Sequence, residues 1–224
     1  MTIAAVVTAA GRGTRLGGAT PKALVPVAGR PLLSHALDRI APLASRIVVT
    51  AVPELVDTFR DVVGGRADVV AGGGSRQDSV WAGIVALGER GMDPDDIVLV
   101  HDAARAFMPT SAMREAIAAV EAGADAAIPV VPVVDTLVAA PNAFGEYGRP
   151  VDRDGVRAVQ TPQVFRARVL VAAHEAAAGR EATDDAALVR ELGYRVVATD
   201  GHPWGLKVTQ AGDLALATFI AENT

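Results

Sequence analysis

A glycine-rich segment near the N-terminus, TAAGRGTRLGGATPK over residues 8–22, combines residue types that suit the binding of phosphate groups. Glycines let the backbone approach a ligand closely, so that several N–H groups can be aimed at phosphate oxygens. Cationic side chains in the same segment add charge that suits a triphosphate. The glycines are Gly11 and Gly13, and the cations are Arg12, Arg15 and Lys22. The segment therefore predicts a triphosphate-binding loop.

Two well-known phosphate-binding loops do not fit this segment. The dinucleotide fingerprint GxGxxG fails because Leu16 stands where the third glycine belongs, and no helical pattern follows at once. The Walker pattern GxxxxGK[ST] is absent. The remaining alternative is a solvated turn with incidental cations. Pro21 fixes the backbone just ahead of Lys22, which favours a functional loop over that alternative.

A second group of polar residues ends a predicted strand in the segment VHDAAR, residues 100–105. Asp102 can hold Mg²⁺ against a triphosphate, because magnesium favours few carboxylates plus phosphate oxygens. A helix N-cap or a structural hydrogen bond is the alternative role for this carboxylate. Arg105 is suited to a phosphate group. We interpret His101 as a structural residue rather than a catalytic base, since alternation along the strand points it away from Asp102.

The elements that must position these residues follow from the hydrophobic pattern, in which short apolar runs alternate with helical periods. The predicted strands cover residues 3–8, 46–50, 68–71, 97–101, 126–131 and 195–199. The predicted helices cover residues 31–40, 53–62, 77–87, 111–122, 166–178, 184–192 and 211–221, with Ser75 as an expected N-cap. This alternation predicts a three-layer α/β/α, Rossmann-like fold with a mostly parallel central sheet. Because ligands bind at the carboxyl ends of such strands, the loops after Thr8, Ala71 and His101 should form the site.

The rhythm of strands and helices breaks between residues 132 and 161. The middle of this stretch, PNAFGEYGRP, has turn residues and no helical period, whereas VVDTLV and VRAVQT on either side favour β structure. A disordered linker is the alternative. We expect a single domain over residues 1–224, with a protruding β-arm at about residues 133–158.

Composition argues against several classes of protein and site. The net charge is −5 and no basic block occurs, so a nucleic-acid surface is not expected. The absence of cysteine excludes disulfides and thiolate metal sites, and it fits the cytoplasm. No apolar run approaches the roughly 18 residues of a membrane span. The first apolar run lacks a preceding basic region, so we interpret it as a core strand rather than a signal peptide.

The glycine-rich segment with its distal PK resembles the signature loop of the GT-A-like nucleotidyltransferases. Further motifs occur in an order that is similar to the 2-C-methyl-D-erythritol 4-phosphate cytidylyltransferase family, from about residue 3 to about residue 220. They are GGGSRQDSV, VHDAAR, VDT, VDRDG, TPQVF, TDDAAL and LKVT. The resemblance implies a GT-A-like fold and the transfer of CMP from CTP to methylerythritol phosphate in the non-mevalonate isoprenoid pathway. It also implies Mg²⁺ as cofactor and a homodimer in which the β-arm clasps the second subunit.

The same resemblance implies a role for each matched residue. Arg15 and Lys22 would stabilise the transition state at the α-phosphate of CTP. The nucleotide would be bound by Ala9, Ala10, Gly11, Gly13, Thr14, Gly73, Gly74, Ser79, Asp102 and Ala103, and Asp102 would be the metal ligand. The acceptor would be bound by Asp102, Arg105, Thr136, Arg153, Thr161 and Lys207, with Thr136 and Arg153 reaching the partner's site from the arm. Lys22 and Lys207 are the only lysines of the chain, and both fall in matched motifs.

The sequence departs from the family pattern at several positions, and it leaves alternatives open. Gly74 stands where many relatives have Asp, Ala106 where most have Pro, and Val138 near a usual Lys or Arg. The segment TDD, residues 183–185, stands where relatives often have TDE, and we interpret it as a helix cap. The nearest alternative function is a cytidylyltransferase for ribitol phosphate or another polyol phosphate. A non-catalytic nucleotide-binding module and a nicotinamide oxidoreductase are more remote.

Overall fold

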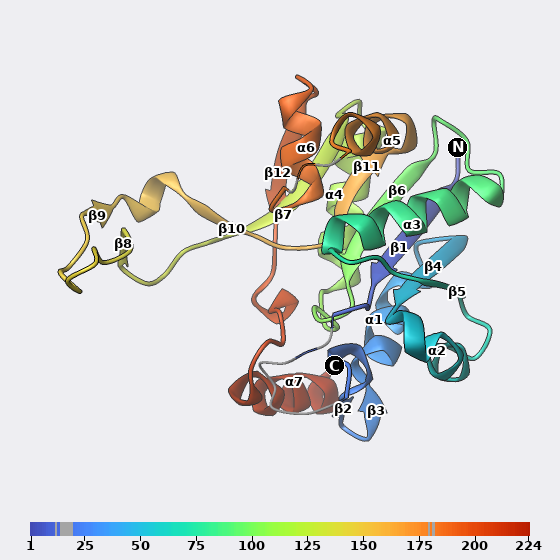
Figure 1. Ribbon diagram of the computed structural model, residues 1–224, viewed down its shortest axis with the longest axis horizontal. Coiled ribbons are helices and arrows are strands. Elements are labelled where there is room, and N and C mark those ends of the chain that lie inside the picture. The colour runs from blue at the N-terminus through green and yellow to red at the C-terminus, as the bar shows by residue number, and fades with distance from the viewer. Residues whose placement is uncertain (12, 14–19, 179, 181) are drawn as a thin grey trace.

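An eight-stranded sheet forms the centre of the protein, and the N-terminal apolar run is one of its inner strands, β1 (Ile3–Thr8) (Figure 1). The computed structural model describes residues 1–11, 13, 20–178, 180 and 182–224. Both neighbours of β1 run parallel to it. Across the sheet the strands are β12 (Val196–Asp200), β7 (Ala126–Pro132), β11 (Gln163–Arg166), β6 (Ile97–Asp102), β1, β4 (Arg46–Ala51) and β5 (Asp68–Ala71), and β10 (Arg157–Val159) pairs with the end of β7.

Most strands run in one direction, as the sequence predicts, whereas β10 and β11 are antiparallel to their neighbours. The sequence pattern does not predict β11. The prediction that a helix begins at residue 166 is also wrong. Arg166 ends β11, and the helix α5 (Ala167–Ala176) begins one residue later. Gln163, Val164 and Phe165 are all buried in the middle of the sheet. A run this short carries no periodic signal of its own.

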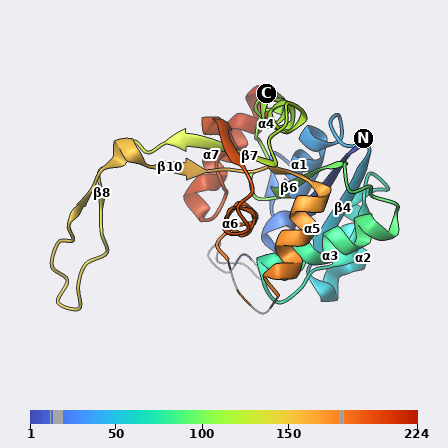
Figure 2. The ribbon, with the colours of Figure 1, turned by 90° about the horizontal axis from the view of Figure 1, so that it is seen from above.

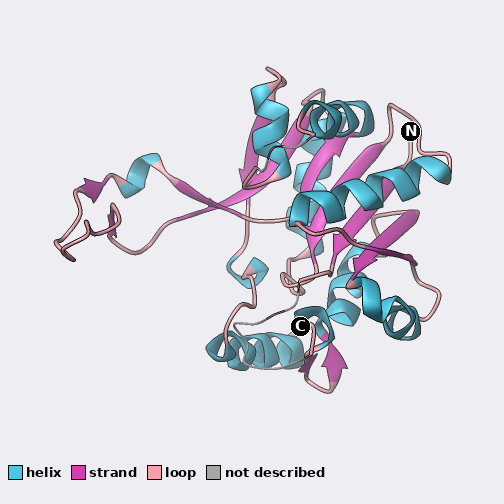
Figure 3. Ribbon diagram, viewed as in Figure 1, coloured by secondary structure: helices cyan, strands magenta, loops and turns pink. Residues whose placement is uncertain are grey.

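Helices cover both faces of the sheet, which confirms the predicted three-layer architecture (Figure 3). Side chains alternate along β1, so that Ala5 and Val7 face one helix layer while Ala4 and Val6 face the other. The first layer contains α1 (Leu32–Ile40), α2 (Val56–Val63) and α4 (Thr110–Glu121). The second contains α3 (Arg76–Glu89), α5 and α6 (Asp185–Glu191). Because the parallel strands run in the same direction between the two helix layers, their carboxyl ends lie together at one edge of the sheet.

A smaller apolar cluster joins the C-terminal helix α7 (Ala211–Asn223) to α1 and to a hairpin. The hairpin strands are β2 (Pro26–Val27) and β3 (Arg30–Pro31). Val27, Leu32, Phe107 and Ile220 are buried in this cluster. Short 3₁₀ helices also belong to the body: η2 (Lys22–Leu24), η3 (Pro53–Leu55) and η5 (Pro203–Gly205). Among the described residues, no helix is long and apolar enough to cross a membrane.

The segment after β7 leaves the body as a long two-stranded arm, as the sequence predicts (Figures 1 and 2). β8 (Leu137–Val138) pairs with β9 (Pro150–Val151), and the 3₁₀ helix η4 (Arg153–Gly155) leads back to β10. Near the tip, Phe144 and Tyr147 are 89% and 75% exposed. An isolated chain therefore presents two large aromatic side chains to water at the end of the arm.

Candidate active site

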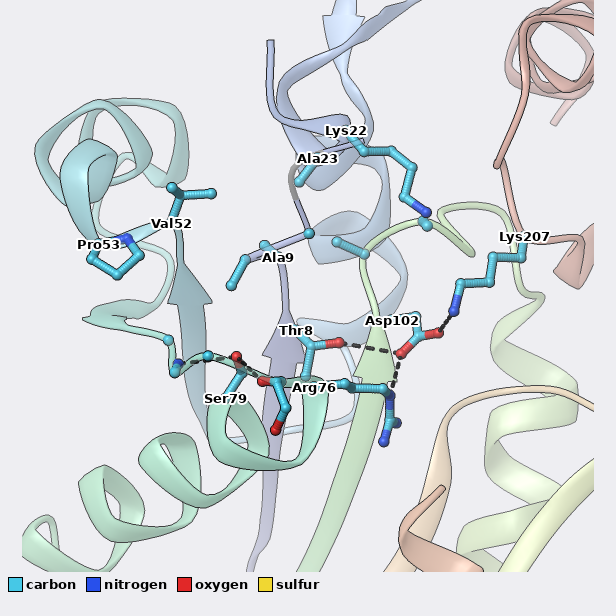
Figure 4. A pocket seen from close by; sticks show the side chains of 18 residues that line it. Thr8, Ala9, Lys22, Ala23, Val52, Pro53, Arg76, Ser79, Asp102 and Lys207 are labelled. Atoms are coloured by element: carbon cyan, nitrogen blue, oxygen red, sulfur yellow. Dashed lines mark hydrogen bonds and ion pairs between the residues drawn. The ribbon is translucent and has the colours of Figure 1, made fainter. Parts of the chain in front are cut away.

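A pocket of about 600 Å³ opens at the carboxyl ends of β1, β5 and β6 (Figure 4). This is the edge where the sequence places the site. The segments after β1, β4, β5 and β6 all contribute to its wall, together with the start of α3 and with Lys207 from the segment before α7. Of the residues that sequence reasoning singled out, the pocket is lined by Ala9, Ala10, Gly11, Lys22, Gly73, Gly74, Ser79, Asp102, Ala103 and Lys207.

The loop after β1 returns to its own start, which brings Lys22 beside Gly11. The Lys22 N–H donates to the Gly11 carbonyl over 3.4 Å. Gly13 has φ +68°, and a Cβ there would lie 2.9 Å from the Lys22 Cβ, so only glycine fits. In Figure 4 the Lys22 side chain extends into the pocket. Arg12, Thr14 and Arg15, which the sequence assigns to this loop, lie outside the described residues.

The loop after β5 is packed so closely that its first two glycines have no room for a side chain. A Cβ on Gly72 would lie 2.7 Å from the Ala10 Cβ, and one on Gly73 would lie 2.3 Å from the Asp78 Cβ. A Cβ on Gly74 would meet nothing closer than 3.7 Å. Gly72 and Gly73 therefore set the shape of this wall, whereas Gly74 leaves space.

Two serines hold the same loop at the start of α3. Ser75 caps the helix: its hydroxyl accepts from the Asp78 N–H, and the Asp78 carboxylate accepts from the Ser75 N–H. The buried Ser79 hydroxyl donates to the Ser75 carbonyl and accepts from the Gly73 N–H. The predicted cap at Ser75 is confirmed, and Ser79 fixes the loop in addition to lining the pocket.

Asp102 ends β6 at the bottom of the pocket, and cations hold it from two sides. Oδ1 accepts from Arg76 Nε at 3.1 Å and from the Thr8 hydroxyl at 3.2 Å. Oδ2 accepts from Lys207 Nζ at 2.6 Å. Burial alone would raise the pKa of Asp102, but the charges of Arg76 and Lys207 outweigh it and lower the pKa far below its usual range. Asp102 is therefore a carboxylate at any physiological pH.

His101 and Thr161 lie beneath Asp102 and support it from the interior. The Thr161 hydroxyl accepts from the Asp102 backbone N–H at 3.0 Å and lies 3.1 Å from His101 Nδ1. His101 Nε2 lies 3.2 Å from the Arg105 carbonyl, which requires a proton on Nε2 and leaves Nδ1 to accept from Thr161. Burial lowers the pKa of His101 to about 4. The side chain is neutral and enclosed, which confirms its interpretation as structural.

Arg105 ties two backbone segments together beside the pocket. Nη1 donates to the Gly205 carbonyl at 2.8 Å, and Nη2 donates to the Val159 carbonyl at 3.0 Å. Burial lowers the pKa of Arg105, although Asp102 works in the opposite direction. The guanidinium therefore connects the root of the arm to the segment that carries Lys207.

Thr136 and Arg153 lie on the arm, where both are exposed. Arg153 Nη1 donates to the Val134 carbonyl at 2.7 Å, within the arm itself. The arm projects away from the body, so these side chains do not line the pocket of their own chain (Figure 2).

Sequence reasoning missed Arg76 and its buried partner Asp185. Arg76 is the first residue of α3, and its Nη1 lies 2.7 Å from Asp185 Oδ2. A cation in the first turn opposes the helix dipole, and this was the signal available in the sequence. The neighbouring Asp184 caps α6 through the Ala187 N–H, which confirms the predicted cap at residues 183–185.

Comparisons with known proteins agree with this fold. A family model described as 2-C-methyl-D-erythritol 4-phosphate cytidylyltransferase matches residues 3–223. The protein of that name from Saccharopolyspora erythraea is 48% identical, over 98% of this chain and 99% of its own. The one from Rhodococcus jostii is 43% identical, over 99% of this chain and 96% of its own. The crystal structure of the Thermus thermophilus protein of the same name has a TM-score of 0.81 and 35% identity, and covers 99% of this chain and 100% of its own.

Proposed function

This chain belongs to the 2-C-methyl-D-erythritol 4-phosphate cytidylyltransferase family, and we propose that the pocket around Asp102 is the site of that family's reaction. The enzyme transfers CMP from CTP to 2-C-methyl-D-erythritol 4-phosphate, giving 4-diphosphocytidyl-2-C-methyl-D-erythritol and pyrophosphate. The reaction supplies a precursor for isoprenoid biosynthesis. The observation that carries the assignment to this pocket is the ion-paired Asp102 between Arg76 and Lys207, at the strand ends where two glycine loops meet.

The chemistry needs positioned charge more than a proton acceptor. A phosphate oxygen of the acceptor attacks the α-phosphorus of CTP, the new P–O bond forms, and the bond to pyrophosphate breaks. A phosphate monoester is already an anionic nucleophile, so no general base is needed, and the neutral His101 is not required for one. Negative charge grows on the oxygens of the α-phosphate, and fixed cations stabilise it. We assign this role to Lys22 and, from its position in the family motif, to Arg15.

The two glycine loops suit the nucleotide. Ala9, Ala10 and Gly11 form one wall, and the family motif adds Gly13 and Thr14 to the nucleotide-binding residues of this segment. Gly73, Gly74 and Ser79 form the facing wall, where the absence of side chains brings backbone donors and acceptors within reach of a base. The cytosine would bind at this second wall and the phosphates at the first, with Ala103 between them.

Asp102 fits the requirements of Mg²⁺. Magnesium typically binds through one or two carboxylates together with phosphate oxygens and water. The Oδ2 atom of Asp102 has Lys207 as its one hydrogen-bond partner among the described residues, and a carboxylate oxygen has two lone-pair sites. When bound, the ion would neutralise charge on the triphosphate. No group of three or more metal-binding side chains occurs in the described residues, so the nucleotide would supply the other ligands.

The acceptor would bind beside Lys207. The Nη1 and Nη2 atoms of Arg105 and the hydroxyl of Thr161 are engaged within the protein, so we propose that these residues hold Asp102 and the Lys207 segment in place. Thr136 and Arg153 would contact the acceptor in the site of a second copy, because their arm extends away from its own pocket. The enzyme would then be a homodimer, and we expect it in the cytoplasm with no nucleic-acid partner.

A panel of acceptors tests this function. Purified protein is incubated with CTP, Mg²⁺ and either methylerythritol phosphate or ribitol phosphate, and pyrophosphate release is followed. We expect rapid release with methylerythritol phosphate and loss of turnover when EDTA removes the metal. Preference for ribitol phosphate would overturn the acceptor, and CTP binding without release for any acceptor would indicate a non-catalytic module.

A further inference from the structure

A row of alternating basic and acidic side chains runs from the pocket into the interior between α3, α5 and α6. Lys207 and Asp102 begin it in the pocket, and Arg76 lies at its centre with Nε 3.1 Å from Asp102 Oδ1. Arg76 Nη1 lies 2.7 Å from Asp185 Oδ2, and Asp185 Oδ1 lies 2.9 Å from His174 Nε2. The function proposed above uses the first part of this row. Asp185 and His174 do not line the pocket and have no role in that scheme.

The inner end of the row is almost completely enclosed. Asp185 is 1% exposed and His174 is 5% exposed. Burial would raise the pKa of Asp185, but the His174 hydrogen bond and the Arg76 charge outweigh it, so the carboxylate stays ionised. Its two oxygens are divided between two partners, one on α3 and one on α5. The carboxylate therefore has a fixed orientation.

A contribution to the stability of the fold does not by itself explain why these charged side chains are paired in the interior. Replacing a buried ion pair by apolar residues of similar volume is often neutral or stabilising, because the charges lose their hydration. An ion pair does, however, fix the direction of a side chain. Arg76 donates along one edge to Asp102 and along another to Asp185, so its planar guanidinium is held at two points. The Arg76 side chain as a whole is 30% exposed and contributes to the pocket wall.

We propose that Asp185 and His174 are positioning residues, which hold Arg76 against Asp102 and so keep the carboxylate directed into the nucleotide pocket. This inference rests on the function proposed above. Without Asp185, the Arg76 cation at the helix N-terminus has one anchor in place of two. It can then swing toward the triphosphate or turn around Asp102, and either movement displaces the carboxylate from its place in the site. Asp185 would thus act on CTP through Arg76 and not by contact.

The chain offers a matched control. Asp185→Asn removes the charge with little change of volume. Asp184→Asn changes the adjacent carboxylate, which bonds the Ala187 N–H and Gln163 and does not contact Arg76. Both variants disturb the start of α6. A second variant, His174→Phe, keeps a ring against Trp81, whose ring lies 6.0 Å from that of His174, but removes the hydrogen bond to Asp185.

A double-mutant cycle separates positioning from general destabilisation. We measure kcat/KM for CTP and the Kd of CTP for wild type, Asp184→Asn, Asp185→Asn, Arg76→Ala and the double variant Arg76→Ala/Asp185→Asn. Loss of a supporting partner of this kind lowers activity roughly 10- to 100-fold. We expect a loss in that range for Asp185→Asn, a smaller loss for His174→Phe, and wild-type CTP parameters for Asp184→Asn. In the Arg76→Ala background, Asp185→Asn should have no further effect.

Two results would overturn the proposal. One is a loss in the double variant equal to the product of the single losses, and the other is an equal effect of Asp184→Asn and Asp185→Asn. If Asp185→Asn does not fold, His174→Phe in the wild-type and Arg76→Ala backgrounds gives the same test. Wild-type protein that binds CTP but releases no pyrophosphate would refute the proposed function. The cycle measured on the Kd of CTP would still decide the positioning role.

Discussion

The amino group of Lys207 lies 2.6 Å from Oδ2 of Asp102, although 105 residues separate the two along the chain. Asp102 is fixed at the end of β6. Lys207 reaches it from the segment before α7, where the Val208 N–H donates to the Ala104 carbonyl at 2.9 Å. This backbone hydrogen bond therefore holds the segment close enough for Lys207 to reach the Asp102 carboxylate. In the proposed function, this pair is where the anionic acceptor meets the nucleotide.

Lys207→Met should abolish most turnover and leave the fold intact. The substitution removes the ammonium group but keeps much of the side chain's length, and the lysine side chain is 38% exposed. Loss of a positioned charge at an active site costs about 10²–10³ in kcat. Pyrophosphate release and a thermal melt, measured on the same preparation, check this expectation. Turnover within about twofold of wild type would exclude Lys207 from the site.

Gly73→Ala and Gly74→Ala should differ in stability, although the two glycines are adjacent. A Cβ on Gly73 would overlap the Asp78 Cβ at 2.3 Å, and one on Gly74 would have ordinary contacts. Overpacking of this kind costs about 1–3 kcal/mol. Thermal melts should show a lower Tm for Gly73→Ala by roughly 2–10 °C and little change for Gly74→Ala. Equal melting temperatures for the two variants would show that the loop does not have this packing.

Stability should fall in mild acid because His101 is buried in its neutral form. Its folded-state pKa is about 4, against about 6.5 in an unfolded chain. Between these values the unfolded chain binds a proton that the folded protein does not, so the free energy of unfolding decreases as pH falls. The loss should be about 2 kcal/mol between pH 7.5 and pH 5. Urea unfolding of wild type and His101→Gln at both pH values measures it, and the same pH dependence in both would contradict it.

Mixing two inactive variants tests whether the arm acts on the partner's site. Arg153→Ala damages the arm, and Lys207→Met damages the pocket. If the arm works in the second subunit, a mixed dimer contains one complete site. Random exchange of equal amounts should then restore about one quarter of wild-type activity. No recovery, although mixed dimers are detected, would place Arg153 in its own chain's site or outside the reaction.

The parts of the fold that the sequence predicts are those with a strong local pattern. Strands such as Ile3–Thr8 and Ile97–Asp102 are continuous apolar runs, and the glycine loops carry their own signal. β11 could not be predicted because four residues just before a helix show no period, and its place in the sheet depends on pairing with β6 and β7. The arm is recognisable because turn residues interrupt the helical rhythm.

The candidate site, too, has features that the sequence predicts and features that it does not. Residues at a strand end or in the segment that follows it, such as Asp102 and Lys22, can be placed from sequence because strand ends meet at one edge. The contacts that orient them cannot, because they join distant segments. The bond between Thr161 and the Asp102 N–H spans 59 residues, and the ion pair of Arg76 with Asp185 spans 109. Burial and pairing of this kind arise only when the chain is folded.

The most direct test of the pocket's role compares wild type with Lys22→Ala in CTP-dependent pyrophosphate release with methylerythritol phosphate. Lys22 is half-buried at the end of the glycine-rich loop and directs its amino group into the pocket (Figure 4). We expect a folded variant with an unchanged circular dichroism spectrum and a kcat lower by about 10²–10³, the effect of removing one fixed charge from a transition state. Near-normal turnover in Lys22→Ala would contradict the assignment of cytidylyl transfer to this pocket.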